Sequence, residues 1–453
     1  MAVAINQPDV VIVGAGFAGL SAAVRLAGRG ARVLVLEARS RLGGRATAFP
    51  DSVTGEIVDN GQHVLFGCYT ATFEFLDEIG ARGNVRLQPQ LSVLMIDPSG
   101  RSSKLQCASL PAPLHLLAGL LDWGALTWAD RLAALRMATP LRLARQAATS
   151  PRVIAASPGE TVEEWLIRWD QTERLREMLW RPLALAALNQ PADRAAAPMF
   201  ARVVAELFGA NAARSAAGFP VTPLDAMYAA PAQAFIERRG GEVVTRAPAK
   251  IVFSGDRSWS VWVGDRQVLP AAVVAAVPWY SLPTLFEQPP ESIGSVIDCA
   301  RRTSSSPIAT VHLWFDRPVL PESFVGLPGR TLQWAFDMRA LRGNQSAHVS
   351  LVSSGAESVV SLPNEALIQM AHQELVDAVP GVRAAGLLRG TVVRERQATF
   401  SLAPDQPARP RTRTDVRGLY LAGDWIDTGL PATIEGAVRS GRQAADAALV
   451  DFT

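Results

Sequence analysis

The clearest pattern of apolar and polar positions lies near the start of the chain. An apolar run, Val10–Val13, leads into the glycine-rich sequence GAGFAG at 14–19, and apolar residues then recur at helical spacing up to Ala27. A second apolar run, Val33–Leu36, ends on the acidic Glu37. Two short apolar runs on either side of an amphipathic helix are typical of buried parallel strands joined by that helix. The pattern therefore predicts a βαβ unit that opens a parallel sheet.

The glycines and the acid of this unit stand in the order of a dinucleotide-binding site. Gly14 permits a tight turn from strand to helix, Gly16 lets a pyrophosphate approach the main chain, and Gly19 lets the helix pack closely on the strand. The N-terminal N–H groups of the helix bind the phosphates. Glu37 lies where a carboxylate accepts hydrogen bonds from ribose hydroxyls. Since no arginine directly precedes Glu37 to bind a 2′-phosphate, the pattern predicts FAD or NAD and not NADP.

Length, charge and cysteine usage narrow the class of protein. A chain of 453 residues is too long for one simple core and suits two joined domains. The formal net charge of +2, without a basic stripe, excludes a nucleic-acid surface. Three cysteines far apart give neither a disulfide framework nor a metal site, and they fit a reducing compartment. Because the first apolar run is a strand and not a signal peptide, we expect a cytoplasmic protein with no bound metal.

The hydropathy of the chain is high for a freely soluble protein. Apolar residues make up 49% of the sequence, and the mean hydropathy is +0.14. The longest uncharged run, 268–286, contains three prolines and reads as a buried strand and turn, so we expect no membrane span. Segment 109–137 is rich in Leu and Trp. It is predicted to be either a core helix of a substrate domain or an interfacial helix whose apolar face inserts into lipid. An apolar tunnel or a membrane-contacting surface would explain the composition.

The sequence RLGGR at 41–45 follows Glu37, where a plain NAD domain usually continues into another crossover helix. This pattern resembles the flavin-containing amine oxidase and phytoene desaturase superfamily, in which such a stretch runs under FAD. The resemblance implies that Gly43 and Gly44 allow close backbone approach and that Arg45 faces phosphate or the flavin edge. It therefore selects FAD as the cofactor.

Four further segments carry a narrower resemblance. DNGQHVLFGCYTAT at 59–72 and the stretches at 181–191, 307–318 and 418–441 resemble the hydroxysqualene dehydroxylases, also described as squalene-associated FAD-dependent desaturases. The pattern departs from that family at Gln190, where we expect Thr, and at Ala192, where we expect Pro. The resemblance implies FAD-dependent reductive dehydroxylation of hydroxysqualene to squalene in bacterial squalene and hopanoid synthesis. It also implies an electron donor for FAD, which the sequence does not identify, and peripheral contact with the inner face of the cytoplasmic membrane.

The resemblance also places the candidate site residues. It implies that Asp424 holds the ribityl or pyrophosphate region and that N–H groups around Thr433 face the flavin pyrimidine. The candidate cofactor-binding residues are Gly14, Gly16, Phe17, Ala18, Gly19, Glu37, Ala38, Arg39, Gly43, Gly44, Arg45, Gly61, Gln62, His63, Ala249, Gly423, Asp424, Thr433 and Ile434. The leaving hydroxyl needs a proton donor, for which His63 and Asp59 are the candidates, with Arg45 as electrostatic support.

The fold that these motifs predict is α/β. We expect a Rossmann-like FAD-binding domain of the GR2 or amine-oxidase type, built from 1–85, 220–285 and 405–453. We expect an interleaved α+β substrate domain with an apolar tunnel, built from 86–219 and 286–404, which includes the membrane-contacting candidate.

Three alternative functions share this fold. An oxidative carotenoid or dehydrosqualene desaturase differs mainly in the direction of electron flow. An amine oxidase usually carries a lysine near the flavin, and no lysine follows Lys250. A non-catalytic prenyl-binding protein would not need the intact cofactor motifs. Fold alone does not choose among these functions.

Overall fold

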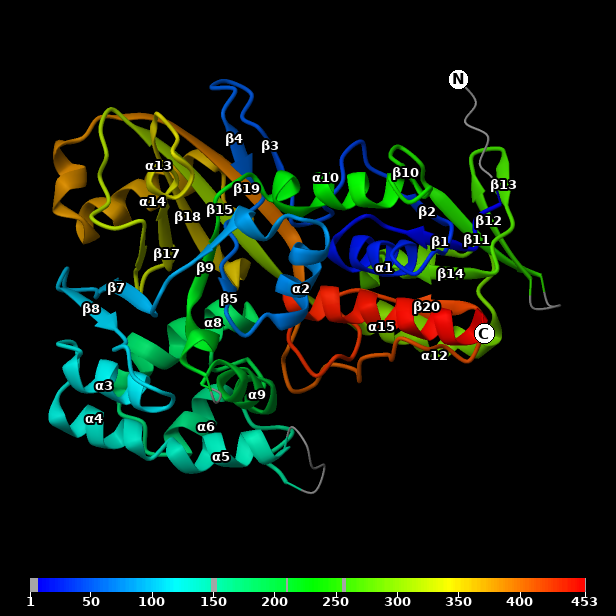
Figure 1. The fold of residues 1–453 in the computed structure, drawn as a ribbon. Coiled ribbons are helices and arrows are strands. Elements are labelled where there is room, and N and C mark those ends of the chain that lie inside the picture. The colour runs from blue at the N-terminus through cyan, green and yellow to red at the C-terminus, as the bar shows by residue number, and fades with distance from the viewer. Residues whose placement is uncertain (1–6, 148–152, 209–210, 255–257, 453) are drawn as a thin grey trace.

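The computed structural model describes residues 7–147, 153–208, 211–254 and 258–452 (Figure 1). The predicted domain ranges also include residues 1–6, 148–152, 209–210, 255–257 and 453, which lie outside the described residues.

A five-stranded parallel sheet contains the predicted βαβ unit. Its strands, in order, are β10 (Glu242–Val244), β2 (Val33–Leu36), β1 (Val10–Val13), β14 (Ala272–Ala275) and β20 (Leu419–Leu421). The strands β1, β2 and β14 are fully buried, because helices and loops cover both faces of the sheet. The predicted α/β fold with a parallel sheet is confirmed. The strands come from three separate stretches, so the sheet forms only when distant parts of the chain meet.

Three helices pack near the sheet: α1 (Phe17–Ala27), α10 (Leu224–Glu237) and α15 (Ile434–Phe452). Figure 1 shows the C-terminal α15 beside the N-terminal α1. Gly441 allows this close approach, since a Cβ atom there would lie 2.1 Å from the Ala18 carbonyl oxygen. The two ends of the chain are therefore packed against each other.

A second, seven-stranded sheet lies beside the first. Its order is β19 (Leu387–Phe400), β15 (Ser305–Phe315), β18 (Ala347–Ser354), β17 (Trp334–Asp337), β16 (Phe324–Gly326), β7 (Ser92–Ile96) and β8 (Ser102–Gln106). Only β16 and β7 pair in parallel among these neighbours. Helix α14 (Asn364–Ala378) packs against β15 and β19. The strands come from the stretches predicted for the substrate domain, whose boundaries stay a prediction.

A group of helices lies next to the seven-stranded sheet (Figure 1). It comprises α3 (Leu114–Asp122), α4 (Trp128–Leu135), α5 (Ala138–Ala147), α6 (Val162–Arg168), α7 (Glu173–Leu175), α8 (Arg181–Leu188) and α9 (Ala197–Leu207). Segment 109–137 thus forms two helices and not one. The break follows from a capping box in which Thr127 and Asp130 start α4. None of the helices within the described ranges is long and apolar enough to cross a bilayer.

Short elements join these layers. They are β3 (Ala48–Pro50), β4 (Ile57–Asp59), β5 (Leu65–Phe66), α2 (Thr70–Glu78), β6 (Val85–Leu87), β9 (Ala217–Pro220), β11 (Ala249–Ser254), β12 (Ser258–Val263), β13 (Arg266–Val268), α11 (Leu282–Leu285), α12 (Gly294–Arg302) and α13 (Met338–Arg342). The segment from β3 to α2 runs between the two large sheets and carries the polar loop at 59–63.

Candidate active site

The turn between β1 and α1 requires glycine at two positions. Gly14 has φ of +107°, and a Cβ atom there would lie 2.4 Å from the Ala276 carbonyl oxygen. A Cβ atom on Gly19 would lie 1.9 Å from the Gly14 carbonyl oxygen. Because contacts this short do not occur, only glycine lets the helix start so close to the sheet.

The N-terminus of α1 faces the loop that contains Gly43 and Gly44. Gly16 is the N-cap of α1 and has no side chain to cap the helix. A Cβ atom on Gly44 would lie 3.3 Å from the Cα atom of Gly16, so the two glycines come face to face. The N–H of Gly43 donates to the Ala15 carbonyl at 2.9 Å, which ties the loop to the turn. This cradle of uncapped N–H groups and bare backbone fits the pyrophosphate of a dinucleotide.

Glu37 closes the other end of the cradle. Its buried carboxylate accepts hydrogen bonds from the N–H groups of Ala15 and Arg39, each at 2.9 Å. Its backbone carbonyl accepts from the N–H of Ala247 at 2.9 Å, so the chain that leads to Ala249 runs beside it. Carboxylate oxygens have further acceptor capacity, so Glu37 can also accept from a ribose hydroxyl.

Tyr228 holds the glycine loop in place, a role that the sequence does not predict. Its hydroxyl donates to the Gly43 carbonyl at 2.8 Å, and its ring stacks on Phe17 with centroids 3.5 Å apart. Tyr228 lies in α10, far from either motif in sequence. No local pattern marks it, because its partners are a backbone carbonyl and the ring of another helix.

The side chains of Arg45 and Asp424 join the N-terminal and C-terminal motifs. Their ion pair has an N–O distance of 2.5 Å, and Arg45 also donates to the Ala398 carbonyl at 2.7 Å. Burial opposes the charge of Arg45, but the Asp424 carboxylate outweighs burial and raises the pKa of the guanidinium. Gly423 has φ of +150°, and a Cβ atom there would lie 2.8 Å from the ring of Trp425. The turn before Asp424 therefore also requires glycine.

The start of α15 completes the site. Ile434 is its first residue, and the Thr433 hydroxyl accepts from the N–H of Gly436 at 3.1 Å. The carboxylate of Glu435 accepts from the N–H and the hydroxyl of Thr72, at 2.9 and 2.8 Å. Glu435 thereby joins α15 to α2, a role that the sequence does not predict although the C-terminal motif contains this residue.

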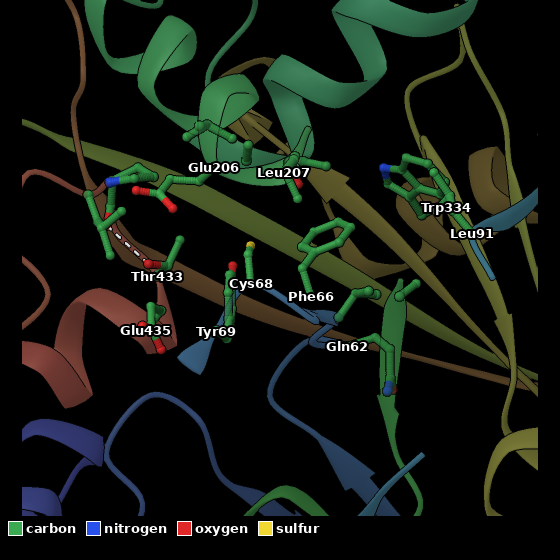
Figure 2. Close-up of a pocket in the computed structure, with 18 of the residues that line it drawn as sticks. Gln62, Phe66, Cys68, Tyr69, Leu91, Glu206, Leu207, Trp334, Thr433 and Glu435 are labelled. Carbon is green, nitrogen blue, oxygen red and sulfur yellow. Dashed lines mark hydrogen bonds between the residues drawn. The ribbon is translucent and has the colours of Figure 1, made fainter. Parts of the chain in front are cut away.

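A largely apolar cavity opens beside these elements (Figure 2). It encloses about 1140 Å³ of space, part of which is open to solvent. Its walls are Gln62, Val64, Phe66, Cys68, Tyr69, Leu91, Val93, Ala186, Ala187, Val203, Glu206, Leu207, Ala217, Phe324, Trp334, Phe336, Val352, Ser354, Leu430, Pro431, Thr433, Glu435 and Arg439. Since the C-terminal motif supplies part of the wall, the cavity lies next to the place where a flavin would be held.

Comparisons with known proteins agree with this geometry. The family model of flavin-containing amine oxidoreductases matches residues 17–449. Hydroxysqualene dehydroxylase of Sinorhizobium fredii is 30% identical over 97% of this chain and 98% of its own length. The chain belongs to the hydroxysqualene dehydroxylase family of flavin-containing amine oxidoreductases. The hydroxysqualene dehydroxylase of Rhodopseudomonas palustris is also 30% identical, over 97% of this chain and 98% of its own.

Solved structures share the fold. Cyclohexylamine oxidase from Brevibacterium oxydans superposes with a TM-score of 0.71 at 18% identity, over 99% of this chain and 100% of its own. The protein is an FAD-dependent oxidoreductase, and the cradle between α1 and the glycine loop fits that cofactor.

The structure separates the residues of the 59–63 loop. Gln62 lines the cavity, and neither atom of its buried amide has a hydrogen-bond partner among the described residues. The Nδ1 atom of His63 lies 3.0 Å from the Gly61 carbonyl, and burial lowers the pKa of His63. Because a carbonyl only accepts, Nδ1 carries the hydrogen in this contact. Among the described residues of this loop, Gln62 is the one whose buried side-chain polar atoms both lack a partner.

Neither His63 nor Asp59 is among the residues that line the cavity, and Asp59 is held by other partners. It is 1% exposed, pairs with the guanidinium of Arg342 and accepts from the N–H of Leu224 at 3.2 Å. Burial raises the pKa of Asp59 to about 6, against the attraction of Arg342. The pair joins β4 to α13, so the structure gives Asp59 a role in holding the loop.

Proposed function

We propose that the protein catalyses the FAD-dependent reductive dehydroxylation of hydroxysqualene to squalene. The apolar cavity beside the C-terminal flavin motif supports this proposal most directly. A triterpenoid chain offers little to hydrogen-bond, so its binding requires a large apolar surface next to the redox centre. The names of the two relatives at 30% identity support the same substrate class.

The proposed reaction breaks one C–O bond and forms one C–H bond. Held in the cradle between Gly16 and Gly44, reduced FAD would supply the hydride, and one proton would convert the leaving hydroxyl to water. The protein must orient the alcohol, exclude bulk water and supply that proton. His63 is our proposed proton donor. Asp59, through its pair with Arg342, positions the loop that carries His63. Arg45 supports the site electrostatically, and the Asp424 carboxylate holds its guanidinium in place. General acid catalysis of this kind contributes roughly a hundred- to ten-thousandfold in rate.

The oxidative desaturase is the alternative function to exclude. Anaerobic, photoreduced protein is mixed with hydroxysqualene while flavin absorbance and squalene are followed. We expect flavin reoxidation with one squalene formed per flavin. A parallel sample of oxidised protein with squalene should show no flavin reduction. Reduction of flavin in the second sample, with no squalene formed in the first, would favour the desaturase.

We also propose peripheral contact with the inner face of the cytoplasmic membrane through α3 and α4. The exposed apolar side chains gathered on this segment are Leu110, Leu114, Leu121, Trp128, Leu132 and Leu135. Trp128 is 70% exposed and Leu132 is 61% exposed, and the guanidinium of Arg131 lies over the Trp128 ring. Exposed Trp and Leu beside Arg suit the interface of an anionic membrane, from which an oily substrate would enter.

A further inference from the structure

The cavity described above has a polar end and an apolar end. In Figure 2, Tyr69, Thr433, Glu435 and Glu206 lie toward one end, and Trp334 and Leu91 lie toward the other. The pKa shifts agree with this grouping. Burial raises the pKa of both Cys68 and Tyr69, and the nearby Glu435 carboxylate raises both further. A cavity of this kind suits a ligand that is mostly hydrocarbon but carries one polar group.

The charged groups at the polar end already have partners. The Glu435 carboxylate accepts from two backbone N–H groups of α2 and from Arg439. The Glu206 carboxylate pairs with Arg202, at 2.6 Å, and with Arg214. These carboxylates are anchored to the wall and are not free to bind a neutral ligand.

The hydroxyl of Tyr69 is different. No hydrogen bond of this hydroxyl is found in the described part of the chain, although the residue lines the cavity. Burial, together with the nearby Cys68 and Glu435, raises the pKa of Tyr69 far above its usual value. The phenol therefore stays protonated and offers a neutral O–H donor to the cavity.

The position of Tyr69 is well fixed. It is the N-cap of α2, and its N–H donates to the Phe66 carbonyl at 2.9 Å. Its ring packs edge-on against Phe66, with centroids 6.1 Å apart. Glu435 holds the first turn of α2 against α15, the helix that follows the C-terminal flavin motif. The phenol is thus held at the flavin end of the cavity.

We propose that the Tyr69 hydroxyl donates a hydrogen bond to the hydroxyl oxygen of a long-chain alcohol and so places its C–O carbon at the flavin end of the cavity. The inference rests on the proposed function and names the residue that recognises the polar group of the substrate. The hydrocarbon product lacks this oxygen, so it loses the contact and binds more weakly. A site built around such a donor discriminates against ligands that lack the hydroxyl, because the donor is then left unpaired.

The test is a binding experiment with Tyr69→Phe, which removes one oxygen atom. Flavin-loaded, oxidised protein is titrated with hydroxysqualene and with squalene, and the dissociation constants are read from changes in flavin absorbance. We expect Tyr69→Phe to weaken binding of hydroxysqualene about two- to tenfold, and squalene to bind as tightly as to the wild type or more tightly, because no donor is left unpaired. The matched control is Tyr420→Phe, which removes a phenol that bonds Asp451 outside the cavity; it should behave as the wild type.

Equal affinities of wild type and Tyr69→Phe for the alcohol would overturn the assignment. So would a loss of affinity that is the same for alcohol and hydrocarbon, since that reports damage to the cavity. Flavin content and thermal unfolding check that the variant folds, and Tyr69→Leu is a second variant that also removes the hydroxyl.

A parallel arm separates this inference from the proposed function. If wild-type protein forms squalene but Tyr69→Phe keeps full preference for the alcohol, only the role of Tyr69 is wrong. If wild-type protein forms no squalene, farnesol and farnesene replace the two ligands in the same titration. If the wild type prefers farnesol to farnesene and Tyr69→Phe loses that preference, the result supports the alcohol site. If Tyr69→Phe keeps the preference, the result overturns the assignment.

Discussion

Arg45 and Asp424 lie 379 positions apart in the sequence, and their side chains form an ion pair at 2.5 Å. The pair connects the glycine loop after β2 to the turn after β20. Both elements border the dinucleotide cradle, so the cradle is complete only when the two ends of the chain have packed together. Binding of FAD and folding of the parallel sheet are therefore expected to be coupled.

Gly44→Ala should reduce the flavin content of the purified protein. The new Cβ atom would lie 3.3 Å from Gly16 Cα, in the gap through which the pyrophosphate is expected to pass. The ratio of flavin to protein absorbance measures the effect. Gly55→Ala is the control, because Gly55 also has positive φ, +71°, but nothing lies within 4 Å of a Cβ atom there. Both variants carry about 1–2 kcal/mol of backbone strain; equal flavin loss in both would contradict the obstruction of the cradle.

His63→Ala should lower turnover roughly a hundred- to ten-thousandfold while FAD stays bound. The wild-type rate should also rise as pH falls below about 6.5, because burial lowers the pKa of His63 and only its cationic form can donate a proton. Single-turnover assays across pH measure both effects. His372→Ala, at a histidine of α14 that packs against Phe315 and not in the 59–63 loop, should keep the wild-type rate. Unchanged turnover in His63→Ala would exclude His63 as the donor.

Acid should destabilise the protein through His312 and His348. Both are 1% exposed, and their rings meet at 3.0 Å between Nδ1 and Nε2. Burial lowers the pKa of His312 to about 4 and, with the neighbouring His312, that of His348 to about 2. The unfolded chain therefore binds protons below about pH 6.5 that the folded chain does not, and stability falls as pH drops.

The expected loss at pH 5 is about 2 kcal/mol for each histidine relative to neutral pH. Urea unfolding of the wild type and of a His312→Leu/His348→Leu variant at pH 7 and pH 5 measures it. The free energy of unfolding of the double variant should decrease less between the two pH values than that of the wild type. A double variant with the full acid sensitivity would show that other groups cause it.

Replacing Trp128 and Leu132 by Ser should weaken binding to anionic liposomes at least tenfold. Each side chain that moves from water into the membrane interface contributes up to about 1.5–3 kcal/mol. Liposome co-sedimentation measures the change. Leu388→Ser is the control, since Leu388 is 69% exposed but lies on β19, outside the α3–α4 surface. If the control and the double variant bind equally, another surface contacts the membrane.

The sequence alone determined the βαβ unit and the fold class. Gly14 and Gly19 stand at positions that backbone sterics reserve for glycine, and Val10–Val13 and Val33–Leu36 are apolar throughout because both faces of the sheet are covered. The glycines and the apolar runs all lie within one short stretch of chain, so the sequence shows them as a local pattern even though Gly14 meets the distant Ala276. The glycine motif left FAD or NAD open; the resemblance carried by residues 41–45 selected FAD, and the family match agrees with it.

Only the tertiary structure decided what the polar side chains do. The sequence predicted Asp59 as a candidate acid, and the structure shows that it lies in a buried ion pair with Arg342. Tyr228 carried no signal, because its hydroxyl bonds a carbonyl of a distant loop, and the sequence around Tyr69 does not show that its hydroxyl is unpaired beside a cavity. Whether a polar side chain has a hydrogen-bond partner depends on groups that folding brings together from distant parts of the chain. The local sequence therefore does not predict it.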